Sequence, residues 1–176
     1  MERFEQIYAD HAEAIRAYVR RRAPEDVVDD VVADVFLVCL RRVDEVPAGA
    51  LPWLYAVARK TLANDRRRRA RRAHAPIDVA YEPEPVGDSA LAAAFAELSE
   101  RDREVLRLVA WEGLSLGDAA RALECSPVAC RVRYHRAKSR LAARLAATAS
   151  FRPEPKGVTR RETTRSSGSP RRTPFP

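Results

Sequence analysis

The sequence has little that would place it in a membrane, in the secretory pathway or on a metal ion. It contains no run of 18 apolar residues, about the length that a membrane-spanning helix needs. Its first ten residues, MERFEQIYAD, lack the apolar stretch of a signal peptide, so we expect a cytosolic protein without membrane insertion. The three cysteines, Cys39, Cys125 and Cys130, are odd in number and lack CxxC spacing.

Patterns for catalysis are also missing. We find no glycine-rich phosphate loop, no metal-ligand spacing and no nucleophile–base pair, so we expect no enzyme, catalytic residue, cofactor, metal or small-molecule substrate. The one combination that would suggest a metal site is Cys125, Cys130 and His135. We favour packing instead, because Cys39 and Cys130 fall on apolar helical stripes, where cysteine behaves as a small hydrophobic residue.

What the sequence does contain is one concentrated positive block. The stretch RKTLANDRRRRARR, residues 59–72, carries eight basic residues and one acidic residue, a net +7 that equals the formal net charge of the whole chain. A single cationic block on an otherwise balanced protein predicts a docking site for a polyanion. A solvated charge run is the alternative. Because the block continues an apolar segment with helical spacing, LPWLYAVARKTLAND, we favour a nucleic-acid-binding helix.

Three helices are expected in the first 73 residues, and no alternating strand pattern is convincing. The predicted helices are residues 4–21, 24–42 and 51–69. The second is rich in valine, but the four-residue repeat of Asp26, Asp30 and Asp34 indicates a helix with three carboxylates on one side. We interpret this acidic stripe as solvated or facing a partner. Residues 43–50 contain a proline and a glycine and are predicted to form a loop.

A change of composition divides the chain into two domains. The segment HAPIDVAYEPEPVGDS has three prolines, four acids and no lysine or arginine, which predicts an extended, flexible acidic linker. Beyond Phe151 the chain is rich in Arg, Ser, Thr and Pro without periodicity, which predicts disorder. We therefore predict an all-α protein with two small helical domains. Its parts are a three-helix domain at 1–73, the linker at 74–89, a second domain at 90–150 and a basic tail at 151–176.

The second domain is predicted to contain a helix-turn-helix. Helix ends are marked by Ser99 with Asp102, by Gly113, by Ser115 with Asp118, and by Ser126 before Pro127. The resulting order is a long helix, a short helix at 116–123, a turn at 124–126 and a long last helix with no acid between residues 126 and 151. A short helix, a small turn and a basic second helix form the helix-turn-helix pattern. The expected buried face of the last helix holds Cys130, Tyr134, Ala137 and Leu141.

Three segments in this order resemble the extracytoplasmic-function (ECF) sigma factors of bacterial RNA polymerase. DDVVADVFLVCLRR, residues 29–42, resembles the polymerase-binding segment of that family. LPWLYAVARKTLANDRRRR, residues 51–69, resembles the segment that melts and reads the −10 promoter element. LSERDREVLRLVAWEGLSLGDAARALECSPVACRVRYHRAKSRL, residues 98–141, resembles the −35-binding domain, which other helix-turn-helix regulators share. With the first helix, the match covers nearly all of residues 4–145.

This resemblance implies a non-enzymatic subunit that directs core polymerase to promoters and helps to melt the −10 element. The implied partners are bacterial core RNA polymerase, promoter DNA and the anti-sigma factor that such proteins often have. The residues implied in polymerase binding are Asp30, Asp34, Phe36 and Arg41. Those implied at the −10 element are Trp53, Tyr55, Arg59, Lys60, Asn64, Arg66, Arg67, Arg68 and Arg69. Those implied at the −35 element are Ser126, Ala129, Arg131, Arg133, Arg136 and Lys138.

Two alternatives remain within this interpretation. For Trp53 we favour packing between the second and third helices over contact with a base. The loop at residues 43–50 is the better candidate for holding a flipped-out base, because the equivalent loop does so in the family. A stand-alone helix-turn-helix transcriptional regulator is the alternative function. It would need a dimer interface or a sensor domain, and the acidic second helix would have no role in it.

The chain also departs from the family's pattern. Ala33 stands where the family commonly has Gln, and Lys60 where it often has Asn. Glu124 replaces a frequent turn glycine, and residues 127–129 replace more polar residues at the start of the recognition helix. The first departure bears on polymerase contact, and the others bear on the promoter sequence that is read.

Overall fold

The computed structural model describes residues 1–73 and 89–150, so the basic tail and all of the predicted linker except Ser89 lie outside the described residues. Within the described ranges the chain forms helices, short 3-10 turns and loops, and no strand. The expectation of an all-α protein is confirmed. None of these helices is both long and apolar enough to cross a membrane.

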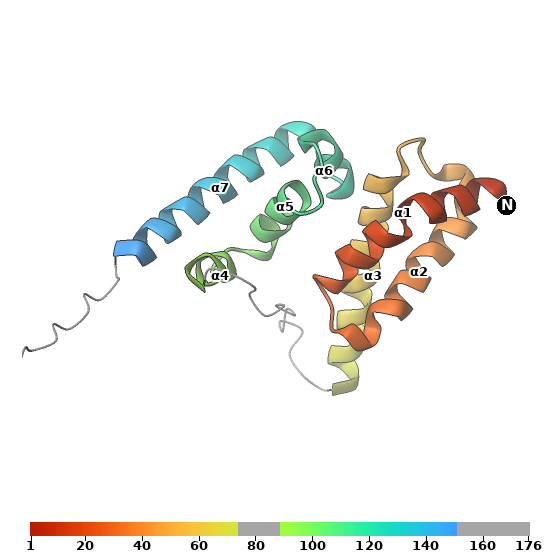
Figure 1. Cartoon of the computed structure of the whole chain (residues 1–176), viewed down its shortest axis with the longest axis horizontal. Helices are drawn as coiled ribbons and strands as arrows, with labels where there is room; N and C mark the ends of the chain where they lie inside the picture. Colours follow the sequence, from red (N-terminus) through yellow and green to blue (C-terminus); the bar gives the residue numbers. More distant parts are fainter. Residues whose placement is uncertain (74–88, 151–176) are drawn as a thin grey trace, which may run out of the picture.

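Three helices pack against one another in the N-terminal half (Figure 1). They are α1 (Glu2–Arg20), α2 (Val28–Arg41) and α3 (Ala50–Ala73), with 3-10 turns at Glu25–Val27 and Val43–Glu45. Ile15 and Val19 of α1, Val35 of α2 and Leu54 of α3 are fully buried in their shared core. Burying each such side chain contributes about 1.5–3 kcal/mol to stability, so this bundle positions α3 firmly.

The valine-rich segment is a helix because its apolar residues recur every three or four positions. Its buried residues are Val28, Val31, Val32, Val35, Phe36 and Cys39. Asp30 and Asp34 lie on the opposite, exposed side. The helix predicted from the aspartate repeat is therefore confirmed, with its first turn wound as a 3-10 turn after Pro24.

The third helix is longer than the sequence predicted. We expected it to end at Arg69, but it continues through the whole basic block to Ala73. Arginine and alanine are good helix formers, and no proline interrupts the segment. Asp65 also supports it, since its carboxylate accepts from Arg68 at 2.8 Å and pairs with Arg69 at 3.0 Å, one turn away.

Residues 89–150 form four helices, which Figure 1 shows together in the C-terminal half. They are α4 (Ser89–Ala96), α5 (Glu100–Ala110), α6 (Leu116–Ala122) and α7 (Pro127–Ser150). The separate helix α4 was not predicted, because SALAAAFA is apolar almost throughout and shows no helical alternation with polar residues. It packs against α7.

The predicted helix starts are confirmed by their hydrogen bonds. The Ser99 hydroxyl accepts from the Asp102 N–H at 3.2 Å, and the Ser115 hydroxyl accepts from the Asp118 N–H at 3.1 Å. The Ser126 hydroxyl accepts from the Ala129 N–H at 3.2 Å. Each bond satisfies an N–H that a helix start leaves without a partner, and is worth about 1 kcal/mol.

The turn between α6 and α7 contains a backbone conformation that side chains rarely adopt. Glu124 has φ 52°, in the left-handed region. This conformation lets the Cys125 N–H donate to the Ala120 carbonyl at 3.0 Å and the Glu124 N–H donate to the Arg121 carbonyl at 3.2 Å. The helix-turn-helix is thus closed by backbone hydrogen bonds at a position where glycine is usual.

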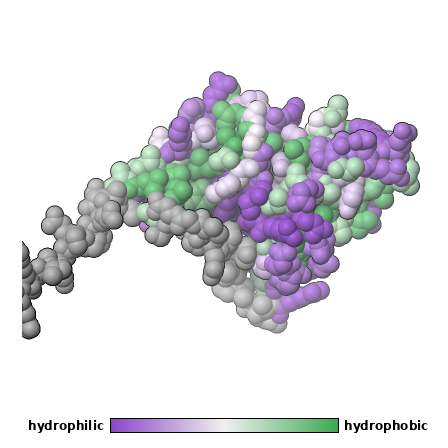
Figure 2. Space-filling model, viewed as in Figure 1, coloured by the Kyte–Doolittle hydropathy of each residue, from purple (hydrophilic) through white to green (hydrophobic). Residues whose placement is uncertain are grey.

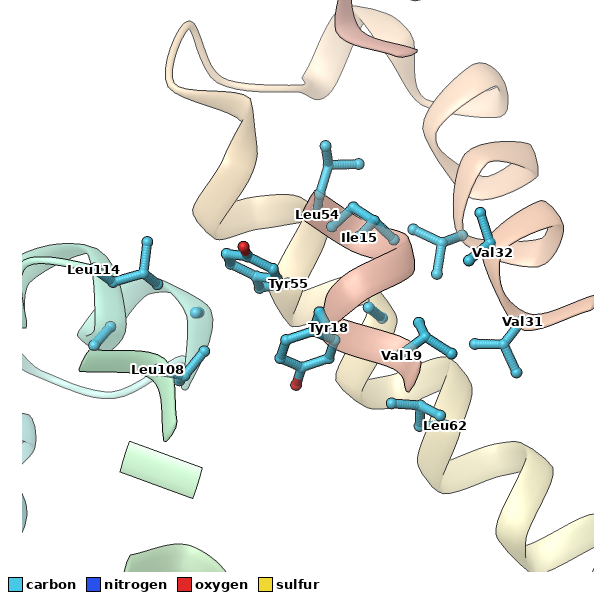
Figure 3. Packing of buried hydrophobic residues seen from close by; sticks show 14 of the residues in the cluster. Ile15, Tyr18, Val19, Val31, Val32, Leu54, Tyr55, Leu62, Leu108 and Leu114 are labelled. Carbon is cyan, nitrogen blue, oxygen red and sulfur yellow. The ribbon is translucent and has the colours of Figure 1, made fainter. Parts of the chain in front are cut away.

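The two halves are in direct contact through α3 and α6. Figure 3 shows Tyr18 of α1 and Tyr55 of α3 on the side of the bundle that faces Leu108 and Leu114 of the C-terminal half. Tyr18 and Tyr55 stack with ring centroids 4.9 Å apart. One buried apolar cluster therefore runs through both halves, which the sequence, interpreted as two modules on a linker, did not predict.

Candidate nucleic-acid interface

The basic block lies on the outer side of α3, and Figure 2 shows strongly hydrophilic surface over the C-terminal half of that helix. Leu54, Ala58 and Leu62 hold its inner side in the core. Of the residues predicted for the −10 element, the exposed ones are Lys60, Asn64, Arg67 and Arg68. The half-buried ones are Trp53, Arg59, Arg66 and Arg69. Because the helix is continuous, these cations form one surface.

Some of these cations have acidic partners within the bundle. Arg69 lies 3.2 Å from Asp26 and 3.0 Å from Asp65, and Arg68 lies 2.8 Å from Asp65. The Asp65 side chain is nearly buried, so it orients both guanidinium groups. Arg67 contacts only the side-chain oxygen of Asn64, at 3.0 Å. Among the described residues, no carboxylate would have to be displaced from Arg67.

Three further cations of α3 pair with acids of the C-terminal half, and for Arg66 the partner is Glu100, with Nη1 and Oε1 4.0 Å apart. Arg59 Nη2 lies 3.0 Å from Glu124 Oε2, and Lys60 Nζ lies 2.5 Å from Glu124 Oε1. The Lys60 and Glu124 side chains are exposed and the Arg59 side chain is half-buried, and salt bridges this open to solvent contribute about 0–1 kcal/mol. The turn of the helix-turn-helix thus covers part of the basic surface with a negative charge.

The two aromatic residues predicted for the −10 element differ in accessibility. Trp53 is half-buried, and its ring lies 5.9 Å from the Arg42 guanidinium carbon. Tyr55 is 3% exposed, and burial, with the Glu112 carboxylate adding to it, raises the pKa of its phenol to about 12. Tyr55 therefore cannot meet DNA in this arrangement, and it stabilises the contact between the halves.

A hollow of about 440 Å³ opens between the start of α1 and the loop before α3. Gln6, Asp10 and His11 line it from α1, and Pro47 and Ala48 from the loop. The Gln6 amide donates to the Asp10 carboxylate at 2.8 Å. The loop predicted to hold a flipped-out base therefore borders an open, partly polar hollow.

The second basic surface is on α7. Of the residues predicted for the −35 element, Ser126, Ala129, Arg131, Arg136 and Lys138 are exposed, and Arg133 is half-buried. The predicted inner face is confirmed: Cys130 and Ala137 are fully buried, and Tyr134 and Leu141 partly so. The Ser126 hydroxyl accepts a hydrogen bond in the helix cap, and the arginines and Lys138 are the charged groups among the predicted residues.

The acidic stripe of α2 has an open surface. Asp30 and Asp34 are exposed, and neither carboxylate pairs with a cation among the described residues. Arg41 is exposed at the end of the same helix. Phe36, which we also expected to contact polymerase, is 4% exposed, with Tyr8 packed on it at a centroid distance of 4.7 Å. Phe36 therefore packs in the core beneath this surface and is not exposed to a partner.

A buried ionic network joins the two halves, and it was not predicted. Arg22, which is 3% exposed, donates from Nε to Glu104 at 3.0 Å and from Nη1 to Glu112 at 2.9 Å. The Tyr18 hydroxyl donates to the other oxygen of Glu104 at 2.7 Å, and Arg21 pairs with Glu112. Its partners lie more than 80 positions apart in sequence. The one local sign is Glu104 directly before the apolar run of α5.

The charges of this network sustain one another. Burial lowers the pKa of Arg22, but the nearby Glu104 and Glu112 carboxylates outweigh this, and its pKa lies above the ordinary value. Burial, with Glu104 adding to it, raises the pKa of Tyr18 well above its ordinary value, so Tyr18 stays neutral and donates. Arg22 Nη2 is nevertheless buried without an acceptor. An unsatisfied buried donor costs about 1–3 kcal/mol, so the network is imperfect.

The cysteines behave as packed side chains. Cys39 and Cys130 are fully buried, and burial raises the pKa of both thiols. Cys125, half-buried in the helix-turn-helix turn, lies against Cys130. Within residues 1–73 and 89–150, no group of three Cys, His, Asp or Glu side chains is arranged to hold a metal ion.

Comparison with known proteins gives consistent similarities. Residues 88–141 match the family "Sigma-70, region 4". The chain is 35% identical over 141 residues to the ECF RNA polymerase sigma factor SigF of Caulobacter vibrioides, which covers 74% of this chain and 79% of that protein. It is 33% identical over 132 residues to the ECF RNA polymerase sigma factor EcfG of Rhodopseudomonas palustris, covering 68% of this chain and 72% of that protein.

Among solved structures, the sigma factor RpoE of Bartonella quintana, in complex with the anti-sigma factor NepR, has a similar fold. The TM-score is 0.63 at 24% identity, and the match covers 83% of this chain and 98% of RpoE. The similarity therefore extends over both helical halves.

Proposed function

Because the chain belongs to the ECF sigma factors of bacterial RNA polymerase, we propose that its two helical halves divide promoter recognition between them. As a sigma factor of this type it directs core polymerase to specific promoters and acts in the initiation of transcription. In our proposal residues 1–73 bind polymerase and the −10 element, residues 90–150 bind the −35 element, and residues 74–89 link them. The observation that carries this division is the presence of a separate cationic helix in each half, α3 and α7.

The −10 element is proposed to lie along α3. Lys60, Arg67 and Arg68 are exposed there and would neutralise phosphates. The hollow beside Pro47 and Ala48 offers a place for an unstacked base. The half-buried Trp53 would border the melted strand from the start of the same helix.

The −35 element is proposed to receive α7 in its major groove. A helix fits that groove, and its first turns reach the base edges. Arg131 and Arg133 stand nearest to the start of the helix and are proposed to meet bases or phosphates. Arg136 and Lys138 lie further along it and are proposed to meet phosphates.

Core polymerase is proposed to dock on α2. Asp30 and Asp34 form an exposed acidic surface against which no described cation lies, so a basic surface of another protein would complement it without displacing a described ion pair. In this role the chain supplies binding and register and no catalytic group or cofactor, and it acts where polymerase acts, in the cytoplasm. An anti-sigma factor that covers one of these surfaces is proposed as a further partner.

While its two halves are in contact, the protein cannot bind both promoter elements at once. The centres of the −35 and −10 elements are about 25 base pairs apart, which is about 85 Å at about 3.4 Å per base pair. In this structure Glu124 of the helix-turn-helix lies 3.0 Å from Arg59 of α3. We therefore propose that the two halves separate when the protein is bound to polymerase and promoter.

A reconstituted transcription assay tests the proposed function. We expect run-off transcripts from a cognate promoter when core polymerase and this protein are both present, and none with either alone. A stand-alone regulator would instead bind its site tightly as a free dimer and leave promoter choice by core polymerase unchanged. That result would overturn the proposed division of promoter recognition.

A further inference from the structure

The first two turns of α7 present an apolar centre to solvent. Val128 is 73% exposed and Val132 is 42% exposed. They are four residues apart and therefore lie one above the other on one face of the helix. The opposite face holds the fully buried Cys130 and Ala137. The two valines thus point directly away from the domain, and no described side chain covers Val128.

Cations border this apolar centre on both sides. At about 100° per residue, Arg131 and Lys138 fall on one side of the line through Val128 and Val132, and Arg136 falls on the other. All three cations are exposed, and the helix carries no acid. A surface with cations at its edges and methyl groups in its middle matches a DNA groove, where phosphates form the edges and bases form the floor.

Pro127 and Ala129, which flank Val128, have no side-chain group that could hydrogen-bond to a base. The Ser126 hydroxyl already accepts from the Ala129 N–H. Ala129 has no polar side-chain atom, and Pro127 has no N–H. At the helix start, where side chains reach base edges, this chain therefore offers mainly methyl groups.

In the major groove the apolar group that a base pair presents is the C5-methyl group of thymine. We propose that Val128 and Val132 are specificity-determining residues that select thymine in the −35 element by packing on its C5-methyl group. This inference rests on the proposed function and adds to it the base that the start of α7 selects. The cationic borders favour DNA over an apolar protein partner for this face, because a protein partner would need acids on both sides of its apolar strip.

The experiment begins with the holoenzyme formed from core polymerase and the full chain. Selection from a promoter library randomised at the −35 element gives the preferred sequence. Each thymine of that sequence is then replaced in turn by deoxyuridine, which keeps the base pair and removes only the methyl group. We expect one or two replacements to weaken holoenzyme binding roughly fourfold, the effect of losing one buried methyl group.

Substitution of the valines completes a double-mutant cycle. Val128→Ala and Val132→Ala fill exposed positions with a better helix former, so they should fold normally. When the valine that packs on the methyl group is replaced by alanine, the holoenzyme should bind the deoxyuridine site as tightly as the thymine site. The matched control is Leu91→Ala, which trims an exposed apolar residue of α4 and should keep the fourfold discrimination.

The outcomes separate this inference from the proposed function. If no −35 sequence is enriched, both are overturned. If a sequence is enriched but the wild-type holoenzyme tolerates deoxyuridine at every thymine, the inference alone is overturned. It is also overturned if the valine variants lose affinity for thymine and deoxyuridine sites equally, which is the result expected when another protein covers these residues.

Discussion

At position 124 the backbone conformation favours glycine, whereas the neighbouring charges favour glutamate. The φ of 52° at Glu124 suits glycine, and a non-glycine residue there costs roughly 1–2 kcal/mol. Its carboxylate, however, lies within 3.0 Å of both Arg59 and Lys60, which a glycine could not reach. The sequence shows that Glu124 replaces the family's turn glycine. The reason is found only in the structure, where Glu124 pairs with two cations of the N-terminal half.

Two substitutions separate these effects at Glu124. Glu124→Gln and Glu124→Gly both remove the charge, but only glycine relieves the backbone. The Gly variant also has a more flexible unfolded chain, and this offsets part of the stability gained from the relieved backbone. We expect the Gly variant to be more stable than the Gln variant by roughly 0.5–1 kcal/mol, measured by urea unfolding of the full chain. A Gln variant of equal or greater stability would show that the turn carries no strain.

At the scale of helices, the sequence predicted what depends on neighbouring residues. The caps at Ser99, Ser115 and Ser126 and the stop at Gly113 are local signals, and the structure contains all four. The helix α4 was not predicted because its residues are almost all apolar and show no helical period. The end of α3 was misplaced because arginines in a run repel one another, but here Asp65 and Asp26 pair with two of them, Arg68 and Arg69, and reduce this repulsion.

The acidic face of α2 gives a prediction at this scale. Changing Asp30 and Asp34 to Lys should weaken binding to core polymerase at least tenfold, because each reversal turns an attractive contact into a repulsive one. Circular dichroism should be unchanged, since both side chains are exposed and neither pairs with a described cation. The matched control changes the exposed Glu5 and Glu13 of α1 to Lys, with the same change in net charge. Equal polymerase affinity for both double variants would mean that the α2 stripe is only solvated.

The two cationic helices should respond differently to loss of an arginine. Arg67→Ala removes an exposed cation of α3 that is proposed to contact a phosphate, so holoenzyme binding should fall on every promoter and its salt slope should decrease by about 0.9. Arg131→Ala should instead cost about 1–3 kcal/mol, mainly on the preferred −35 sequence, if it reads a base edge. Binding at several salt concentrations on matched and scrambled −35 sites distinguishes them.

Arg20→Ala provides the control for these two variants, because Arg20 is an exposed arginine of α1 outside both basic surfaces. It should change neither the affinity nor the salt slope. An equal loss on matched and scrambled −35 sites for Arg131→Ala would assign that residue to a phosphate. An unchanged salt slope for Arg67→Ala would remove α3 from the proposed path of the DNA.

For the whole molecule, the contact between the halves could not be predicted from local patterns. Its members are distant in sequence: Tyr18 and Arg22 belong to α1 and the turn after it, and Glu104 and Glu112 belong to α5 and the turn after it. Charged residues are usually expected on the surface, so their types also gave no sign of burial. Such a network is compatible with the proposed separation of the two halves, because its charged groups regain hydration when the halves separate.

Neutralising the acidic side of this network should open the chain. Glu104→Gln with Glu112→Gln keeps the side-chain shapes but leaves Arg22 buried without a carboxylate, which typically costs about 3–5 kcal/mol. The bundle core around Ile15, Val35 and Leu54 contains neither residue, so the helices should persist while the halves separate. We expect a larger radius of gyration by X-ray scattering with unchanged far-ultraviolet circular dichroism.

The control for opening is Glu97→Gln, which removes the exposed pair with Arg144 inside the C-terminal half and should leave the radius of gyration unchanged. If the double variant unfolds, circular dichroism will report it, and the single variant Glu112→Gln then provides the test. That variant keeps the Glu104 bonds to Tyr18 and Arg22, so it should open only in part. A folded double variant as compact as the wild type would show that apolar packing around Tyr55 holds the halves together, and that the ionic network does not control their separation.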